Sequence, residues 1–394
     1  MCHDQHAYVG PRLVTDDAVL ENHAVVVSGG RIDSVVPREQ LPAGIATTDL
    51  GPGYLTPGFI DIHVHGAAGH GYHEATPEAF AAIGSALLAA GVTTALPTLA
   101  SASIESLEAA LDTLAGLGGS AGPWLPGAHL EGPYFSPAQR GAQDINALRV
   151  PSDGSADRIL ERAGDVAMVS FAPELDGSVV LTERLVAAGI VAAAGHSDGT
   201  AEDLARCEAA GLSHVIHVFS GQSTTVRRGP WRVPGMLEAT LASDTLTVEM
   251  IADGKHLPPL LMRLAHRGAG DRLCLVSDAT PGAGLPDGSR YQLADVSYDV
   301  VDGVGMTRER DAFGGSTTLL GQMLPIAKES LGISLPAAVA MVTAVPARAA
   351  RLTDVGRLVP GYWADLTLLD HDLVPRAVAL RGAWQTTAPM EGTV

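Results

Sequence analysis

Short runs of apolar, mostly β-branched residues alternate along the chain with longer segments rich in Ala, Leu, Glu and Arg. Apolar runs bounded by Gly, Pro or Asp are typical of buried strands, and the longer segments have the length of helices. This alternation predicts βα units that form a parallel sheet. We expect eight strands, at residues 58–63, 92–96, 126–130, 166–171, 190–194, 214–219, 247–251 and 273–277.

Eight strands separated by helical segments predict an α/β fold of the (β/α)8 TIM-like barrel type. The two ends of the chain have a different pattern. Residues 7–54 contain alternating runs and a turn signal at Gly29-Gly30, which we interpret as antiparallel hairpins, and the stretch from Gly356 has the same pattern. We therefore predict a small β-sandwich domain built from residues 1–55 and 356–394, and a barrel over residues 56–355.

The charge of the chain narrows the classes of partner. Its 394 residues carry 44 acidic and 25 basic side chains, a formal net charge of −19. Phosphates of nucleic acid or of anionic lipid would be repelled by such a surface, so we expect neither partner, whereas divalent cations suit it. The uncharged stretch 79–104 is interrupted by Gly91 and Pro97, which predict a helix, a turn and a strand rather than a membrane span.

Cysteine usage and the start of the sequence bear on the compartment. The three cysteines, Cys2, Cys207 and Cys274, are far apart, which favours neither a disulfide framework nor a zinc knuckle. The first ten residues lack a basic region followed by an apolar stretch, so we expect no signal peptide. Both observations favour the cytoplasm.

Residues suited to metal binding follow the predicted strands, at the end of a barrel that carries active sites. His63 and His65 are two positions apart, so on an extended segment both imidazoles point to the same side. One His-X-His pair alone also occurs by chance. Four further polar residues belong to other predicted strands: Glu131, His196 and Asp278 each follow one, and His217 lies near the end of the sixth.

Imidazole nitrogens together with a carboxylate are a typical ligand set for zinc, and a catalytic site leaves one position open for water. Glu131, His196 and His217 supply three such ligands. Asp278 then has a separate role: it takes a proton from the metal-bound water and later gives it to a leaving group. The structural alternative for Asp278 is an N-cap of a following helix.

Several strings of this sequence resemble one family of the amidohydrolase superfamily, the N-acetylglucosamine-6-phosphate deacetylases. The strings are PGFIDIHVHG at 57–66, HLEGPY at 129–134, GHS at 195–197, IADGKH at 251–256, LVSDA at 275–279 and VPARA at 345–349. HLEGP is the most specific, because the commoner members of the superfamily use a carbamylated lysine to bridge metals. Neither Lys255 nor Lys328 follows an early strand.

The resemblance implies roles for the metal ligands. Glu131, His196 and His217 would hold the principal ion, and His63 and His65 a second ion that Glu131 bridges. We expect one or two ions per subunit, Zn²⁺ first, with Fe²⁺, Mn²⁺ and Co²⁺ as alternatives.

The resemblance also assigns the acid/base role to Asp278. It makes His256 a substrate-orienting residue, for which a buried structural histidine is the alternative. His214 precedes His217 by three residues on the same strand, and we expect it to be structural.

Three segments would contact the substrate, and two of them depart from the family pattern. Ser220-Gly221 stands where relatives have Asn-Ala after the histidine, and Ala142-Gln143 stands where many relatives have a histidine that polarises the scissile carbonyl. Glutamine still donates a hydrogen bond but cannot change its charge. Gly314-Gly315 resembles the family's turn against the sugar.

An arginine of the family reaches the phosphate of the substrate in the neighbouring subunit. Arg232 in Arg232-Val-Pro-Gly235 corresponds to it if about four residues are inserted upstream, and Arg227 and Arg228 are rival candidates. An arginine donated across subunits requires at least a dimer, so we expect a homodimer.

The residues predict a metal-dependent hydrolase, and the resemblance implies that it deacetylates N-acetylglucosamine 6-phosphate to glucosamine 6-phosphate and acetate, metal-bound hydroxide attacking the acetamide. The same chemistry on a galactosamine analogue, an unphosphorylated amino sugar or a cyclic amide stays open. Two alternatives from other classes are a Schiff-base aldolase using Lys255 and a non-catalytic sugar-phosphate sensor.

Overall fold

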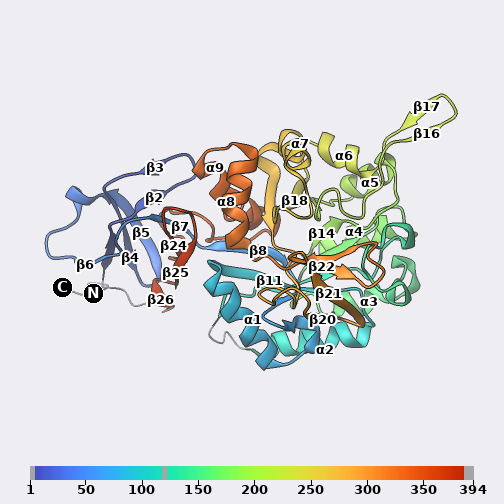
Figure 1. The fold of residues 1–394 in the computed structure, drawn as a ribbon, viewed down its shortest axis with the longest axis horizontal. Coiled ribbons are helices and arrows are strands. Elements are labelled where there is room, and N and C mark those ends of the chain that lie inside the picture. Colours follow the sequence, from blue (N-terminus) through green and yellow to red (C-terminus); the bar gives the residue numbers. More distant parts are fainter. Residues whose placement is uncertain (1–4, 118–121, 386–394) are drawn as a thin grey trace.

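The computed structural model describes residues 5–117 and 122–385, which form a barrel with a smaller β domain beside it (Figure 1). Cys2 lies outside the described residues, and the described cysteines, Cys207 and Cys274, are buried and free. Among the described helices, none combines the length and apolar character that crossing a bilayer requires.

The barrel is built from eight parallel strands in sequence order. They are β8 (Phe59–Val64), β11 (Val92–Ala100), β12 (Ala128–Glu131), β13 (Val166–Phe171), β14 (Val191–Ala194), β15 (His214–Val215), β18 (Thr247–Ile251) and β19 (Leu273–Val276). The sheet closes after β19, where the Asp278 amide donates to the His63 carbonyl over 2.8 Å and Val64 bridges Ala279 in parallel. The predicted barrel is confirmed, and a strand is found at each of the eight predicted places. The sixth is shorter than predicted, because β15 ends at Val215 and residues 216–219 are not in a strand.

Helices surround these strands on the outside (Figure 1). They are α1 (Pro77–Ala89), α2 (Ile104–Gly116), α3 (Ala156–Glu161), α4 (Ser178–Ala187), α5 (Ala201–Ala209), α6 (Met236–Ala242), α7 (Pro259–Ala269), α8 (Leu320–Leu331), α9 (Leu335–Ala340) and α10 (Ala344–Ala349). Local sequence explains where several begin: Thr76, Ser103 and Thr200 each accept a backbone N–H in the first turn of the helix that follows. The stretch 79–104 forms α1, a turn and β11, as predicted.

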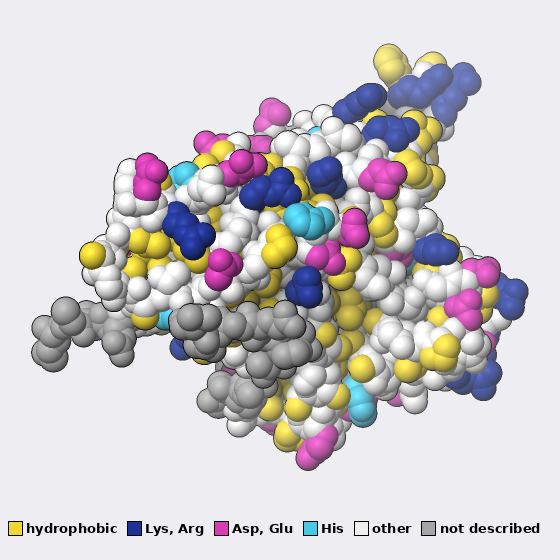
Figure 2. Space-filling model, turned by 60° about the vertical axis from the view of Figure 1, so that its left-hand side comes forward, with side chains coloured by type: hydrophobic (Ala, Val, Ile, Leu, Met, Phe, Trp, Pro, Cys, Tyr) yellow, Lys and Arg dark blue, Asp and Glu magenta, His cyan; other side chains and the backbone are white. Residues whose placement is uncertain are grey.

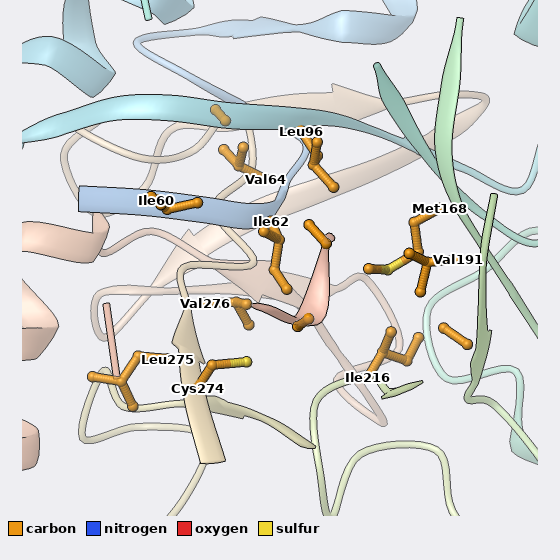
Figure 3. Packing of buried hydrophobic residues seen from close by; sticks show 14 of the residues in the cluster. Ile60, Ile62, Val64, Leu96, Met168, Val191, Ile216, Cys274, Leu275 and Val276 are labelled. Atoms are coloured by element: carbon orange, nitrogen blue, oxygen red, sulfur yellow. The ribbon is translucent and has the colours of Figure 1, made fainter. Parts of the chain in front are cut away.

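The barrel core is made by apolar side chains that converge from different strands (Figure 3). Ile62 of β8, Met168 of β13 and Val276 of β19 are fully buried. Burying a side chain of this size stabilises the fold by roughly 1.5–3 kcal/mol. The strand ends that carry polar residues are therefore held by a rigid, closely packed base.

The small β domain draws strands from both ends of the chain, as predicted. One sheet contains β1 (His6–Val9), β4 (His23–Ser28), β5 (Arg31–Pro37) and β6 (Ala46–Asp49). The other contains β2 (Arg12–Val14), β3 (Val19–Leu20), β7 (Tyr54–Pro57), β24 (Leu366–Leu369), β25 (Pro375–Leu380) and β26 (Ala383–Gln385). Leu13, Val25 and Leu366 from these strands share one buried cluster.

The expectation of purely antiparallel hairpins over residues 7–54 is wrong in part. β4 and β5 pair antiparallel through the predicted Gly29-Gly30 turn, but β1 pairs with β6, and β2 with β7, in parallel. The partners of each parallel pair are separated by long crossovers, which a pattern of alternating residues does not reveal.

Two features extend from the barrel between its strands and helices. A four-stranded antiparallel sheet, β20 (Arg290–Leu293), β21 (Val296–Val301), β22 (Val304–Thr307) and β23 (Phe313–Ser316), separates β19 from α8. We did not predict it, although Asp302-Gly303, with φ of 52° and 70°, is a two-residue hairpin signal. A short hairpin, β9 (Gly66–Ala67) and β10 (His70–Gly71), follows β8.

A second hairpin, β16 (Val226–Arg228) and β17 (Trp231–Val233), projects from the body of the molecule (Figure 1). Cationic side chains gather on this projection in Figure 2. Its side chains include Arg227, Arg228 and Arg232, all exposed, and Trp231 is 74% exposed.

Candidate active site

The centre of the site is the carboxylate of Glu131, at the end of β12. Its Oε1 lies 3.1 Å from His196 Nε2 and 3.0 Å from His217 Nε2. Its Oε2 lies 3.4 Å from His65 Nε2, and Oε1 lies 3.7 Å from His63 Nε2. The structure thus brings together the five predicted metal ligands from β8, β12 and the segments that follow β8, β14 and β15.

Three of the four imidazoles have their tautomer set by a partner on Nδ1. Nδ1 of His65 faces the Thr98 carbonyl at 3.2 Å, and Nδ1 of His196 faces the Gln139 carbonyl at 2.9 Å. A carbonyl only accepts, so in both rings Nδ1 carries a hydrogen. Nε2 is then the atom that faces the carboxylate, as an N–H when the ring is protonated and as a lone pair when a cation takes the place of that proton. His63 is oriented in the same sense by a carboxylate on its Nδ1 side, at 2.8 Å.

Lone pairs directed at a carboxylate are favourable only when a proton or a cation lies between them. Burial opposes ionisation of Glu131, but hydrogen bonds from His196 and His217 and the nearby His63 hold its pKa well below the usual range. Nε2 of His63 is buried with no hydrogen-bond partner. Imidazole nitrogens and a carboxylate that meet in this way fit a divalent cation such as zinc. Two groups satisfy the spacing of a metal site here: Glu131, His196 and His217, and His63, His65 and Glu131.

Asp278 follows β19 and completes the polar cluster. Its Oδ1 lies 3.3 Å from His65 Nε2 and 3.6 Å from His63 Nε2. Burial would raise the pKa of Asp278, but the hydrogen bond and charge of His65 and the charge of His63 lower it. No helix follows Asp278 before β20, so the N-cap alternative is excluded. Its φ of 47° is unusual for a non-glycine residue and turns the side chain toward the ligands.

Ala142 and Gln143 line the cavity from the loop that follows β12. The Gln143 amide donates to Glu131 Oε2 over 2.6 Å, and its oxygen accepts from the Ser101 amide over 2.8 Å. One amide hydrogen is therefore left for a substrate. The Ala142 carbonyl accepts from the Tyr298 hydroxyl over 2.7 Å, which ties this loop to the inserted sheet.

His256 lies across the cavity and is held in one orientation by Asp253. Nδ1 of His256 is 2.7 Å from Asp253 Oδ2, which leaves Nε2 available to the cavity. Burial opposes ionisation of Asp253, yet hydrogen bonds from His256 lower the pKa of the carboxyl to about 2. The His256 ring also packs edge to face with the Phe313 ring, with centroids 4.9 Å apart.

Ser220, Gly221, Gly314 and Gly315 line the remaining wall. At two of these positions only glycine fits. A Cβ on Gly221 would lie 2.6 Å from His196 Nδ1, and one on Gly315 would lie 2.4 Å from Thr280 Cγ2. Both glycines have positive φ, 59° and 76°, which other residues rarely adopt.

These side chains surround a cavity of about 420 Å³, a volume typical of sites for small molecules. The inserted sheet and its β22–β23 turn supply lining residues that the sequence analysis missed: Leu293, Val296, Tyr298, Met306 and Phe313 from the strands, and Arg310 from the turn. Arg310 is the one arginine among the described lining residues. The Asp302-Gly303 hairpin signal could have revealed this sheet, but not which of its side chains faces the cavity.

Arg228 and Arg232 are not among the residues that line this cavity within one subunit. Both lie on the β16–β17 hairpin, where Arg232 donates to the Pro230 carbonyl over 3.2 Å. Lys255 is exposed and likewise outside the lining, which excludes a Schiff-base role for it in this cavity.

Comparisons with known proteins agree with this geometry. The model of the Amidohydrolase family matches residues 54–392, and a NagA composite domain matches residues 6–53. The chain belongs to the amidohydrolase family. This confirms the predicted class of enzyme, and a divalent-metal requirement is typical of that family.

Individual relatives of this amidohydrolase are matched over most of their length. It is 29% identical over 381 residues to the N-acetylgalactosamine-6-phosphate deacetylase of Escherichia coli O157:H7, covering 96% of this chain and 98% of the relative. It is 33% identical over 327 residues to the N-acetylglucosamine-6-phosphate deacetylase of Vibrio furnissii, covering 82% and 80%.

Solved structures give the same result for the fold. N-acetylglucosamine-6-phosphate deacetylase from Pasteurella multocida superposes with a TM-score of 0.91 at 26% identity, covering 97% of this chain and 100% of that one. A mutant of the Mycobacterium smegmatis enzyme in complex with N-acetyl-D-glucosamine-6-phosphate gives 0.87 at 32% identity, covering 97% and 99%. The resemblance stated from the sequence is therefore confirmed.

Proposed function

We propose that this amidohydrolase removes the acetyl group from N-acetylglucosamine 6-phosphate, giving glucosamine 6-phosphate and acetate. The observation that carries the proposal is the convergence of four imidazoles, Glu131 and Asp278 on one wall of a cavity of small-molecule size. Relatives and solved structures with this named activity match nearly the whole chain. We further propose a cytoplasmic enzyme that uses Zn²⁺.

Each polar group around the cavity has a role in this reaction. A bound divalent cation supplies Lewis acidity toward an amide carbonyl and lowers the pKa of water. Asp278 takes the proton from the attacking water through Oδ1 and delivers it to the departing sugar nitrogen, so one catalytic residue serves as base and then as acid. Gln143 directs its remaining amide hydrogen at the acetamide oxygen, and His256 orients the sugar through Nε2.

The phosphate requires a cation on a protein whose net charge is −19. A guanidinium matches phosphate oxygens with two parallel donors. Arg310 lines the cavity and makes no ion pair with any described residue. Arg228 or Arg232 would reach the phosphate only from a second subunit, and the projecting hairpin that carries them supports a homodimer of this kind.

The galactosamine epimer is a second candidate substrate. The E. coli relative named for it aligns with 96% of this chain, about as completely as the Haemophilus influenzae relative named for the glucosamine substrate, which aligns with 97%. The two sugars differ at one hydroxyl, so the cation site, Asp278 and the phosphate contacts serve both. Ser220-Gly221, which departs from the Asn-Ala pattern, is the segment that we expect to affect this choice.

The test is acetate release from four sugars: N-acetylglucosamine and N-acetylgalactosamine, each with and without the 6-phosphate. We expect the highest kcat/KM for N-acetylglucosamine 6-phosphate. A preference for either sugar without phosphate would contradict the proposal. The Asp278→Asn variant is the control for contaminating deacetylases, because acetate release that belongs to this enzyme should fall by at least ~10²-fold for each of the four sugars.

A further inference from the structure

A fully buried carboxylate, Glu249 on β18, lies behind the proposed metal ligands. Its Oε2 is 2.8 Å from His63 Nδ1, and its Oε1 is 2.8 Å from His214 Nε2. Burial opposes its ionisation, but the charges and hydrogen bonds of His63 and His214 lower the pKa of Glu249. The cavity lining does not include Glu249, so it does not contact a substrate there.

His63 differs from the other ligand rings in the partner on its far nitrogen. His65 and His196 each direct Nδ1 at a main-chain carbonyl, which accepts a hydrogen bond but carries no charge. His63 directs Nδ1 at a carboxylate. A carboxylate in this position fixes the ring tautomer and also makes the opposite nitrogen a stronger donor to a cation.

Glu249 is itself held in place from two sides. His214, whose Nδ1 is 2.7 Å from Thr247 Oγ1, occupies the other carboxylate oxygen. The His217 amide donates to Glu249 Oε2 over 3.2 Å. The Glu249 carboxylate therefore has little freedom to turn away from His63. These contacts support the structural role that we expected for His214 from its place on the strand.

His63, His129 and Glu249 also have the spacing of a metal site, but their atoms are already used. His129 Nδ1 lies 3.2 Å from the Ile62 carbonyl, and its Nε2 is hydrogen-bonded to Ser170 Oγ. Both nitrogens of His129 therefore have partners, and His63 Nδ1 faces Glu249. This group is the hydrogen-bonded support of the ligands and not a further cation site.

We propose that Glu249, held by His214, is the positioning residue that enables a second divalent cation to bind between His63, His65 and Glu131. The inference rests on the proposed metal site and deepens it. Without the carboxylate, His63 would lose the group that fixes its donor nitrogen and offsets the added positive charge. The principal ion, held by Glu131, His196 and His217, does not use the His63 ring and should bind nearly as before.

The test is a zinc titration in chelator-buffered solution, with the number of bound ions read by native mass spectrometry. For the unmodified protein we expect two resolved binding steps. In Glu249→Gln, which keeps the shape and removes the charge, the second step should weaken by roughly 10- to 100-fold, the usual cost of losing such a partner. The first step should change by less than about threefold. Asp365→Asn, which neutralises a buried carboxyl in the small β domain, is the matched control and should leave both steps unchanged.

A double-mutant cycle separates positioning from general damage to the fold. His63→Asn removes the ring through which Glu249 acts, so Glu249→Gln should have no further effect on metal binding in that background. A single binding step in the unmodified protein, an unchanged second step in Glu249→Gln, or equal weakening of both steps would overturn the proposal. If Glu249→Gln does not fold, His214→Gln provides the same test and should weaken the second step alone. Because this readout needs no substrate, its outcome is independent of whether the enzyme releases acetate.

Discussion

The two ends of the cavity are built in different ways. At the metal end, Glu131 and its four histidines are buried, and three of the four rings have a second hydrogen bond that orients them. At the end proposed for the phosphate, Arg310 lines the cavity, and Arg228 and Arg232, which lie outside its lining within one subunit, are the other candidates. All three are exposed, and none forms an ion pair with another described residue.

This difference shows which part of the function one chain completes by itself. A buried, oriented ligand set is ready to bind a cation with little loss of entropy, because burial and hydrogen bonds have already fixed the side chains. An exposed arginine loses conformational freedom when it binds an anion. Its contribution to the free energy of substrate binding therefore depends on which groups surround it once the substrate is bound. Substitutions should therefore have the largest effects at the metal end.

The largest effect is expected for Glu131→Gln. This change removes the one carboxylate that faces all four imidazoles, so the protein should lose its tightly bound metal, and deacetylation should fall to background. Elemental analysis for zinc, iron and manganese, together with acetate release, tests the prediction. Asp365→Asn should keep both metal and activity. Full metal content and activity in Glu131→Gln would remove Glu131 from the centre of the site.

Asp278→Asn should come next. Since Asn cannot accept and return a proton, kcat should fall by at least ~10²-fold, the range for a positioned acid/base. Substrate binding should persist, because Asp278 is proposed to move a proton and not to hold the sugar. Steady-state acetate release measures the change in kcat, and isothermal titration calorimetry measures substrate binding. A variant that unfolds, or one that keeps its kcat, would assign Asp278 a structural role instead.

Truncation of an arginine at the phosphate end should have an intermediate effect. A charge-assisted hydrogen bond contributes roughly 1.5–3 kcal/mol, so loss of the arginine that binds phosphate should raise KM by about 10- to 100-fold for the phosphorylated sugar only. Arg310→Ala, Arg228→Ala and Arg232→Ala are to be compared. Arg308→Ala, in the same loop as Arg310 but outside the cavity lining, is the control.

The result also tests how the phosphate end is assembled. An effect of Arg310→Ala would place the anion contact within one subunit. An effect of Arg228→Ala or Arg232→Ala would require a second subunit, and subunit dilution should then raise KM in the same way. If all three variants behave like the unmodified enzyme, backbone amides around Ser220-Gly221 are the remaining anchor for the anion.

The same contrast explains how much the sequence could predict. His63, Glu131 and Asp278 could be placed together because parallel strands of a barrel end on one face, so position after a strand determines position in the site. Glu249 lies within a strand, and its contact with His63 depends on the side-chain packing between β8, β15 and β18, which no local pattern encodes. Arg310 lies in the β22–β23 turn of an inserted sheet, and the placement of that sheet over the barrel depends on long-range packing.

The smallest effect on catalysis is expected for Asp253→Asn. Asp253 orients His256, which lines the cavity across from the metal ligands. Asp253 Oδ1 accepts from the Lys255 and His256 amides over 2.8 and 2.9 Å, and Oδ2 accepts from Ser316 Oγ over 3.0 Å and from the His256 ring. Asparagine has only one accepting oxygen, so one side of this arrangement must be lost. We expect a modest rise in KM, because the His256 ring is then less firmly oriented, and little change in kcat.

The pH dependence of stability tests the charge on Asp253. Its pKa of about 2 in the folded protein lies below the value of about 3.9 for an unfolded chain. A lowered folded pKa stabilises the protein at pH values above the unfolded pKa, here by roughly 2.5 kcal/mol, and this contribution disappears as the pH falls from about 4 toward 2. Urea unfolding of the metal-free protein should therefore show that Asp253→Asn has a lower free energy of unfolding than the unmodified protein at pH 7. This difference in stability should narrow below pH 4.

Asp365→Asn is the control of opposite sign. Because burial raises the pKa of Asp365, loss of its charge should be neutral or stabilising at pH 7. A gap for Asp253→Asn that stays constant down to pH 3 would show that packing, and not the carboxylate charge, holds His256 in place.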